Sequence, residues 1–282
     1  MRRAPVERRK EARLVFWRDN QGASLAPDDF ESIDSAGPDR MLCESRTPEI
    51  SLSGIRQEKG PERATSKTWK RSLEHGGHTV VVGIDVGSLT RGFHAVTLKE
   101  GRYFGKLRSS DTRAVASWCK ASGAEIIGID APCRWSATGR ARRAERELMA
   151  EGVWCFSTPS FDIARDHPTD YFGWMRCGAM LYVDLMSSGY SLFCGTRPPG
   201  HPVCFETFPH AIACALQGEV VSAKHKRQVR RRLLQENAID TEALTNIDWI
   251  DAALCALAAH HLLRGAVKAY GGMEEGFIVV PG

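Results

Sequence analysis

Five acidic residues stand where carboxylates are unusual: three follow runs of apolar β-forming residues, and two open an alanine-rich helix near the C-terminus. They are Asp85, Asp130, Glu206, Asp248 and Asp251. A carboxylate at the mouth of a buried strand is costly to desolvate unless its charge is compensated. Several such carboxylates can lie close together if they share a cation, most simply a hard divalent metal with oxygen ligands. The pattern therefore indicates a candidate metal-dependent enzyme.

The two C-terminal aspartates have a spacing that suits a shared site. Asp248 lies one helical turn before Asp251, so the two side chains fall on the same face of the expected helix. Asp85 ends the run Val80-Val81-Val82-Gly83-Ile84, and Asp130 ends Ile126-Ile127-Gly128-Ile129. We expect both to mark the ends of buried strands.

Each acid also has an ordinary structural alternative. Asp85 could stabilise a turn, and Asp130 could cap the segment that follows it. Asp248 could be a helix N-cap, while Asp251 could complement the helix dipole. Glu206 could pair with His210 or with an arginine. The metal interpretation therefore depends on whether the acids converge in space.

Basic residues form a second group with possible chemistry. The net charge of +4 is mild, but arginine and lysine concentrate in the segments 134–146 and 224–232. Such clusters can neutralise nucleic-acid phosphates, although solvated helix faces have the same composition. The candidates for substrate binding are Arg134, Arg140, Arg143, Lys226 and Arg230, and Arg142 belongs to the same run.

Aromatic residues accompany the first basic run. Trp135, Trp154, Phe156 and Phe161 could stack nucleic-acid bases. The alternative is that they pack at the edge of a core.

The apolar periodicity predicts an α/β domain with a mixed sheet. Three strands are expected first, then helices alternating with two further strands. The expected strands are 79–84, 92–98, 103–107, 125–130 and 202–207, with a possible short strand at 277–280. The expected helices are 112–121, 140–150, 171–186, 209–216, 224–237 and 248–265, with a long loop over 154–169. Ligands in such sheets gather at the carboxyl ends of parallel strands, which is where Asp85, Asp130 and Glu206 fall.

Residues 1–77 show no sustained helical or strand period, and Pro, Gly, Ser, Glu and Arg dominate them. Such a segment buries too little apolar surface to offset its conformational entropy. We expect a disordered N-terminal extension and a folded domain over 78–282. A linker, or translated sequence upstream of the true start, would have the same composition.

The sequence also indicates where in the cell the protein is located. No stretch approaches the ~18 consecutive apolar residues of a membrane span, and the N-terminus lacks the apolar core of a signal peptide. The nine cysteines are scattered and none forms C-x-x-C, which favours reduced thiols over a disulfide framework or a zinc site. We therefore expect a cytoplasmic protein with no membrane association.

Several motifs together resemble a known group of proteins. Gly83-Ile84-Asp85-Val86-Gly87-Ser88, followed by Gly92-Phe93, resembles the first strand and hairpin of RNase H-like nucleases, especially RuvC-type resolvases. Asp248-x-x-Asp251-Ala252-x-x-Cys255-Ala256 resembles the C-terminal helix of the same enzymes. The span 79–281 is similar more specifically to domain-of-unknown-function family 429, a group of predicted RNase H-fold nucleases. The motifs that carry this similarity lie at 127–132, 206–210, 226–234 and 248–259.

The resemblance implies a fold and an activity. The fold would be an RNase H-like mixed five-stranded sheet flanked by helices. The activity would be hydrolysis of DNA or RNA phosphodiester bonds with two Mg²⁺ or Mn²⁺ ions, which activate the attacking water and stabilise the leaving oxygen. Asp85 would bridge the metals, and Asp130 and Asp251 would complete their shells. Asp248 and Glu206 would bind metal or position water.

Two other functions fit parts of the sequence. The turn Asp85-Val86-Gly87-Ser88 also matches the first phosphate turn of actin-like and sugar-kinase-like ATP-dependent phosphotransferases. Those proteins need a second glycine-rich phosphate loop and a second domain, and neither is evident. The remaining alternative is a catalytically inactive nucleic-acid-binding module with vestigial acids.

Overall fold

The first apolar run forms a central strand of the sheet. The computed structural model describes residues 79–197, 200–222 and 224–282, so the predicted extension over 1–77 lies outside the described residues. Strand β1 (Val80–Val86) pairs antiparallel with β2 (Phe93–Lys99) and parallel with β4 (Ala124–Asp130). Its β-branched residues suit a strand that is buried on both faces.

A single mixed sheet runs through the described residues in the order β3-β2-β1-β4-β6-β8-β7, with β5 paired to β6. The additional strands are β3 (Arg102–Ser109), β5 (Ser191–Leu192), β6 (Val203–Glu206), β7 (Val267–Gly272) and β8 (Gly276–Pro281). Strands β4, β6 and β8 continue the parallel arrangement that β1 begins, while β2, β3 and β7 pair antiparallel. The mixed sheet flanked by helices is thus confirmed, but it has eight strands rather than five.

The strands absent from the prediction have little apolar periodicity. Strand β7 is an edge strand in which Tyr270 alone is buried and which ends in two glycines, and β5 is only two residues long. Neither has the apolar alternation that identifies a strand in a sequence.

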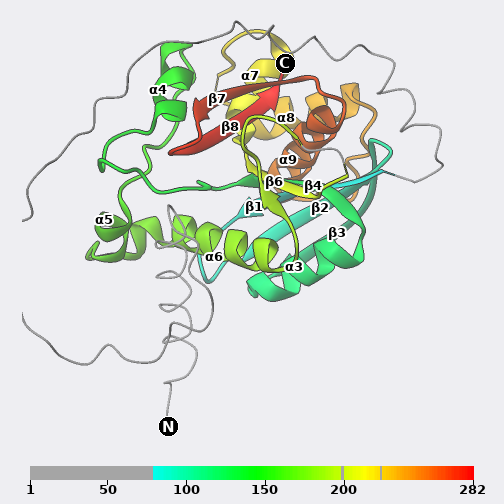
Figure 1. Ribbon diagram of the computed structural model, residues 1–282. Coiled ribbons are helices and arrows are strands. Elements are labelled where there is room, and N and C mark those ends of the chain that lie inside the picture. Colours follow the sequence, from blue (N-terminus) through cyan, green and yellow to red (C-terminus); the bar gives the residue numbers. More distant parts are fainter. Residues whose placement is uncertain (1–78, 198–199, 223) are drawn as a thin grey trace, which may run out of the picture. The chain divides into compact units, whose positions relative to one another are not determined.

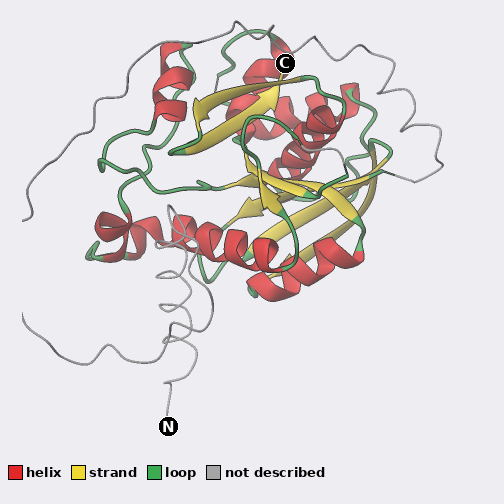
Figure 2. Cartoon of the chain, viewed as in Figure 1, coloured by secondary structure: helices red, strands yellow, loops and turns green. Residues whose placement is uncertain are grey.

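Helices cover both faces of the sheet (Figures 1 and 2). Helices α3 (Thr112–Ala121) and α6 (Gly173–Ser187) pack against each other on one face. Helices α7 (Pro209–Gln217), α8 (Lys226–Glu236) and α9 (Ile247–Leu263) pack together on the other face. Strand residues alternate between the two cores, with Val81 facing α9 and Val80 and Val82 facing α3 and α6, as the two-residue period of a strand requires.

Two glycines let α9 lie directly on the sheet. A Cβ atom at Gly83 would overlap the backbone of Ala252 and Ala256, and one at Gly128 would overlap the backbone of Cys255. Because each glycine stands two residues before an aspartate of the same strand, this close approach brings the start of α9 to the ends of β1 and β4. The packing of small residues therefore positions the candidate acids.

The connecting segment between β4 and α6 differs from the prediction in two places. Helix α4 (Arg143–Ala150) begins three residues later than expected, because Arg142 is its extended N-cap. The predicted loop over 154–169 contains the short helix α5 (Phe161–Arg165), which Ser160 caps by accepting a hydrogen bond from the Ile163 N–H. A turn of 3-10 helix, η1 (Asp170–Phe172), leads into α6. None of the helices in the described ranges is long and apolar enough to cross a membrane.

Candidate active site

Asp85 and Asp130 lie side by side at the carboxyl ends of two parallel strands. They are direct partners in the β1–β4 register, so their side chains project from the same face of the sheet. Both residues are half-buried. Asp251, in the second turn of α9, is buried where α9 crosses β1 and β4. The structure thus brings together the three acids predicted as metal ligands.

The three acids influence one another's ionisation. Burial, followed by the charges of Asp130, Asp251 and Asp248, raises the pKa of Asp85 well above its usual value. Burial and the neighbouring Asp251 raise the pKa of Asp130 to about 8. Burial also raises the pKa of Asp251. Like charges that share a buried site disfavour their ionised forms, so these residues form one electrostatic group, hereafter the acid cluster (Asp85, Asp130, Asp251).

An arginine lies against the acid cluster. Arg230 of α8 is buried, and its Nη1 lies 2.5 Å from Oδ1 of Asp251. Its charge lowers the pKa of Asp85, Asp130 and Asp251, opposing the effect of burial. The sequence predicted Arg230 as a phosphate-binding residue on a basic helix, whereas the structure pairs it with a candidate metal ligand.

Asp248 lies close enough to the acid cluster to act on its ionisation. It is half-buried in the first turn of α9 and raises the pKa of Asp85. The N-cap of α9 is Asn246, whose side chain accepts a hydrogen bond of 2.9 Å from the Trp249 N–H. The capping role considered for Asp248 therefore belongs to Asn246.

Glu206 has an arginine partner, which is one of the alternatives that its sequence left open. It is buried beside Asp130 and raises the pKa of that residue. Its Oε1 lies 2.5 Å from Arg142 Nη2, and its Oε2 accepts hydrogen bonds from Arg142 Nη1 and from the Cys133 N–H. Both carboxylate oxygens of Glu206 therefore already accept hydrogen bonds from the protein.

The sequence did not indicate that Arg142 is buried and paired with two glutamates. It stands in a run of arginines that suggested phosphate contacts, yet its side chain is only 1% exposed. Its Nε donates to Glu145, whose carboxylate also accepts hydrogen bonds from the backbone and hydroxyl of Thr158. Arg142 differs from the neighbouring arginines in its position as the N-cap of α4, with Glu145 three residues later.

The other predicted basic residues are more accessible. Arg140, Arg143 and Lys226 are exposed, and Arg134 is half-buried. Arg143 pairs with Glu147 in the next turn at 2.7 Å. These four residues have the accessibility that a contact with a polyanion requires.

A further basic group, absent from the prediction, lies on β2 and β3. Lys106 is positioned over the Trp249 ring at 4.7 Å from its centroid, and His94 meets the same ring edge-on at 4.5 Å between centroids. Asp248, Arg108 and Lys106 all act on the pKa of His94, which burial lowers. Exposed charges that alternate along an edge strand are ordinary in a sequence, so nothing singled them out.

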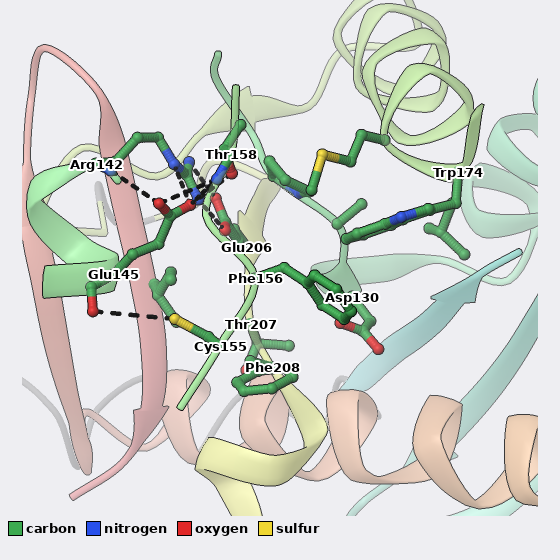
Figure 3. A pocket seen from close by; sticks show the side chains of 15 residues that line it. Asp130, Arg142, Glu145, Cys155, Phe156, Thr158, Trp174, Glu206, Thr207 and Phe208 are labelled. Carbon is green, nitrogen blue, oxygen red and sulfur yellow. Dashed lines mark hydrogen bonds and ion pairs between the residues drawn. The ribbon is translucent and has the colours of Figure 1, made fainter. Parts of the chain in front are cut away.

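A cavity of about 240 Å³ opens beside Asp130 (Figure 3). Asp130, Phe156, Trp174 and Phe208 line one part of it, and Arg142 and Glu206 line another. The predicted aromatic group divides accordingly. Trp154 and Phe156 are exposed, whereas Trp135 and Phe161 are buried and pack against each other in the core.

The acid cluster fits a hard divalent cation by its donor chemistry. Its carboxylate oxygens are the ligands that Mg²⁺ and Mn²⁺ prefer, and burial together with the neighbouring carboxylates raises the pKa of Asp85 and Asp130. As the side chains stand in the described ranges, no group of three or more His, Cys, Asp and Glu residues is arranged to hold a metal ion. Because Oδ1 of Asp251 faces Arg230, a cation that took this oxygen would have to replace the guanidinium.

Two of three comparisons with known proteins found a match. Residues 83–275 match the family described as protein of unknown function (DUF429). No curated protein matches the chain. Among solved structures, the chain is similar to the Thermus thermophilus RuvC structure, with 15% sequence identity and a TM-score of 0.38, over 66% of this chain and 95% of that one. Since the family match covers more than half of the sequence, the protein belongs to the DUF429 family.

Proposed function

We propose that this protein is a metal-dependent nuclease that hydrolyses phosphodiester bonds of nucleic acid. The observation that supports this most strongly is the pairing of Asp85 with Asp130 at the ends of two parallel strands, with Asp251 brought beside them by α9. A cluster of buried and half-buried carboxylates destabilises the folded protein unless a cation compensates it. Such a cluster is therefore more readily explained by a bound metal than by structure alone.

Asp85, Asp130 and Asp251 would hold Mg²⁺ or Mn²⁺. When bound, these ions would supply Lewis-acid stabilisation of the phosphoryl oxygens and lower the pKa of a water molecule. Asp248, half-buried in the first turn of α9, would orient a water molecule beside the acid cluster. Arg230, once released from Asp251, would donate its planar guanidinium to a phosphate through two parallel N–H groups.

We assign Glu206 a positioning role rather than a role as metal ligand. Its carboxylate binds Arg142 and the Cys133 N–H, and Cys133 lies three residues after Asp130. Glu206 thereby fixes the turn that follows β4. Arg134, Arg140, Arg143 and Lys226 would contact phosphates along the nucleic acid, because they are accessible and basic.

A nucleic-acid-binding module without catalytic activity is the second candidate. The ion pair between Arg230 and Asp251 favours it, since this pair compensates one of the carboxylates without any metal. The two candidates make opposite predictions for hydrolysis.

A cleavage assay separates these candidates. The full chain is incubated with single-stranded and double-stranded DNA and RNA in Mg²⁺, Mn²⁺ or EDTA, beside Asp85→Asn and Asp130→Asn. Glu236→Gln, an exposed acid on α8, is the control. We expect cleavage that requires metal and is lost in both cluster variants but not in the control. Binding without cleavage would support the inactive module.

A further inference from the structure

Three aromatic side chains line one part of the cavity beside Asp130 (Figure 3). Phe156, Trp174 and Phe208 line it together with Met175. Phe156 and Trp174 meet edge to face with 6.3 Å between their ring centroids. Although Phe156 belongs to a cavity wall, its side chain is 64% exposed. Its ring is therefore accessible to a ligand.

Another part of the lining carries the charged residues Arg142, Glu145 and Glu206, whose charges bind one another. The Arg142 guanidinium makes five hydrogen bonds, two of them to Glu206 and one to Glu145. One buried guanidinium beside two buried carboxylates leaves this wall with a net charge of −1. A phosphate would be repelled here, whereas an uncharged group would not.

The size of the cavity further restricts the ligand. Its volume of about 240 Å³ is below the ~300 Å³ at which pockets for drug-sized molecules begin. One flat heterocycle suits this space better than a whole nucleotide does. Aromatic walls also favour a flat ring, because rings stack on the faces of Phe and Trp side chains.

Asp130 connects this cavity to the acid cluster. The residue lines the cavity and is also the strand partner of Asp85. A phosphodiester located at the acid cluster would therefore have its attached sugar and base at the entrance of the cavity. Of these two groups, the base is the flat, uncharged and aromatic one.

We propose that the cavity lined by Phe156, Trp174 and Phe208 binds a single unpaired nucleobase of the nucleic acid that occupies the acid cluster. This inference rests on the proposed nuclease function and specifies its substrate. A base inside a duplex reaches such a cavity only after it has left the stack. Single-stranded or locally unpaired nucleic acid is therefore the preferred substrate, and stacking provides the recognition without sequence specificity.

The test measures binding by fluorescence anisotropy with the full chain. Single-stranded DNA and RNA oligonucleotides and the corresponding duplexes are used, with Ca²⁺ in place of Mg²⁺ and with the integrity of each oligonucleotide checked on a gel. Phe156→Ala is compared with Phe104→Ala, a matched control on β3 whose phenylalanine is 65% exposed. Phe156→Tyr keeps a ring that can stack.

We expect Phe156→Ala to weaken binding of the single strand at least about fivefold and to leave duplex binding unchanged. Phe156→Tyr and Phe104→Ala should bind like the wild type. Single strands that contain abasic positions should bind the wild type and Phe156→Ala with the same, weaker affinity. Wild-type affinity of Phe156→Ala for the intact single strand would overturn the proposal.

The outcomes also separate this proposal from the proposed nuclease function. If wild-type and Phe156→Ala proteins bind single strands equally while both cleave nucleic acid in a metal-dependent reaction, only the base site is refuted. If binding depends on Phe156 but no metal supports cleavage, the base site is supported and the hydrolytic function is refuted. A wild-type protein that binds no oligonucleotide would refute both.

Discussion

Arg230 of α8 makes a buried ion pair with Asp251 of α9, with 2.5 Å between Nη1 and Oδ1. The arginine thus faces the one acid of the cluster that comes from a helix, while Asp85 and Asp130 share the neighbouring strands. In the proposed enzyme this guanidinium neutralises Asp251 until a metal ion binds and replaces it. Several measurements follow from that arrangement.

Removing the guanidinium should destabilise the metal-free protein and increase its response to metal. Arg230→Gln leaves Asp251 as a buried carboxylate without its partner, a change that typically costs about 3–5 kcal/mol. Mn²⁺ should recover part of this loss, so the rise in melting temperature on adding Mn²⁺ should be larger than in the wild type.

Arg232→Gln is the control for this measurement, because Arg232 is exposed and pairs only weakly with Glu236 at 3.5 Å. It should change the free energy of unfolding by no more than about 0.5 kcal/mol. A Mn²⁺ response of Arg230→Gln equal to or below that of the wild type would show that Arg230 does not compete with a cation.

The acid cluster should make the metal-free protein less stable as the pH rises. The pKa of Asp130 is about 8 in the folded protein, against an ordinary value of 3.8. Between these values the folded state binds more protons than the unfolded state, so the free energy of unfolding falls with increasing pH. Asp130→Asn should flatten this dependence, as measured by urea denaturation in EDTA from about pH 4 to pH 8.

Binding of Mn²⁺ should show the opposite trend, because carboxylate ligands must lose their protons before they bind. Its affinity is expected to increase over the upper part of the same pH range. An affinity that is independent of pH there would place the metal away from Asp130.

The contact between α9 and the sheet should tolerate no side chain at Gly83. Gly83→Ala forces a methyl group into the backbone of Ala252 and Ala256, and overpacking of this kind typically costs about 1–3 kcal/mol. The same displacement of α9 should weaken Mn²⁺ binding, since α9 carries Asp251. Gly105→Ala is the matched control, because a Cβ at that position on β3 has nothing within 4 Å. Equal urea midpoints for the two variants would contradict this account of the packing.

The role of Glu206 can be separated from that of a metal ligand. Glu206→Gln weakens the buried pair with Arg142 and should lower the free energy of unfolding by several kcal/mol. Replacing both partners, as in Arg142→Met with Glu206→Leu, should recover part of that loss, because no charge is then left buried alone. If instead Glu206→Gln keeps its stability and loses Mn²⁺ binding, Glu206 belongs to the metal site.

The sequence predicted those parts of the fold and site that apolar runs mark. The runs before Asp85 and Asp130 are continuous and β-branched, so both the strands and the acids at their ends could be located. The burial of Arg142 and Arg230 could not, because each stands in a basic run that has the composition of a solvated helix face. Each arginine is buried because a carboxylate from a distant part of the sequence pairs with it. Arg142 pairs with Glu206, and Arg230 pairs with Asp251.

Aromatic residues illustrate the same limit. Phe156 lies in irregular backbone and Phe161 five residues later begins the short helix α5, yet the first is exposed at a cavity and the second is in the core. Irregular backbone around Phe156 has no period from which a facing direction could be inferred, and the five residues of α5 are too few to establish one. Strand β7 was missed because an edge strand can fold with few apolar residues, and its sequence therefore has no apolar period.

The location of a bound metal tests the central claim most directly. Crystals of the protein grown in Mn²⁺ would be measured for anomalous scattering at the manganese absorption edge. We predict a peak between the carboxylates of Asp85 and Asp130, with Asp251 released from Arg230 and turned toward the metal. An acid cluster without a peak at a Mn²⁺ concentration that supports cleavage, with the Arg230–Asp251 pair intact, would contradict the account.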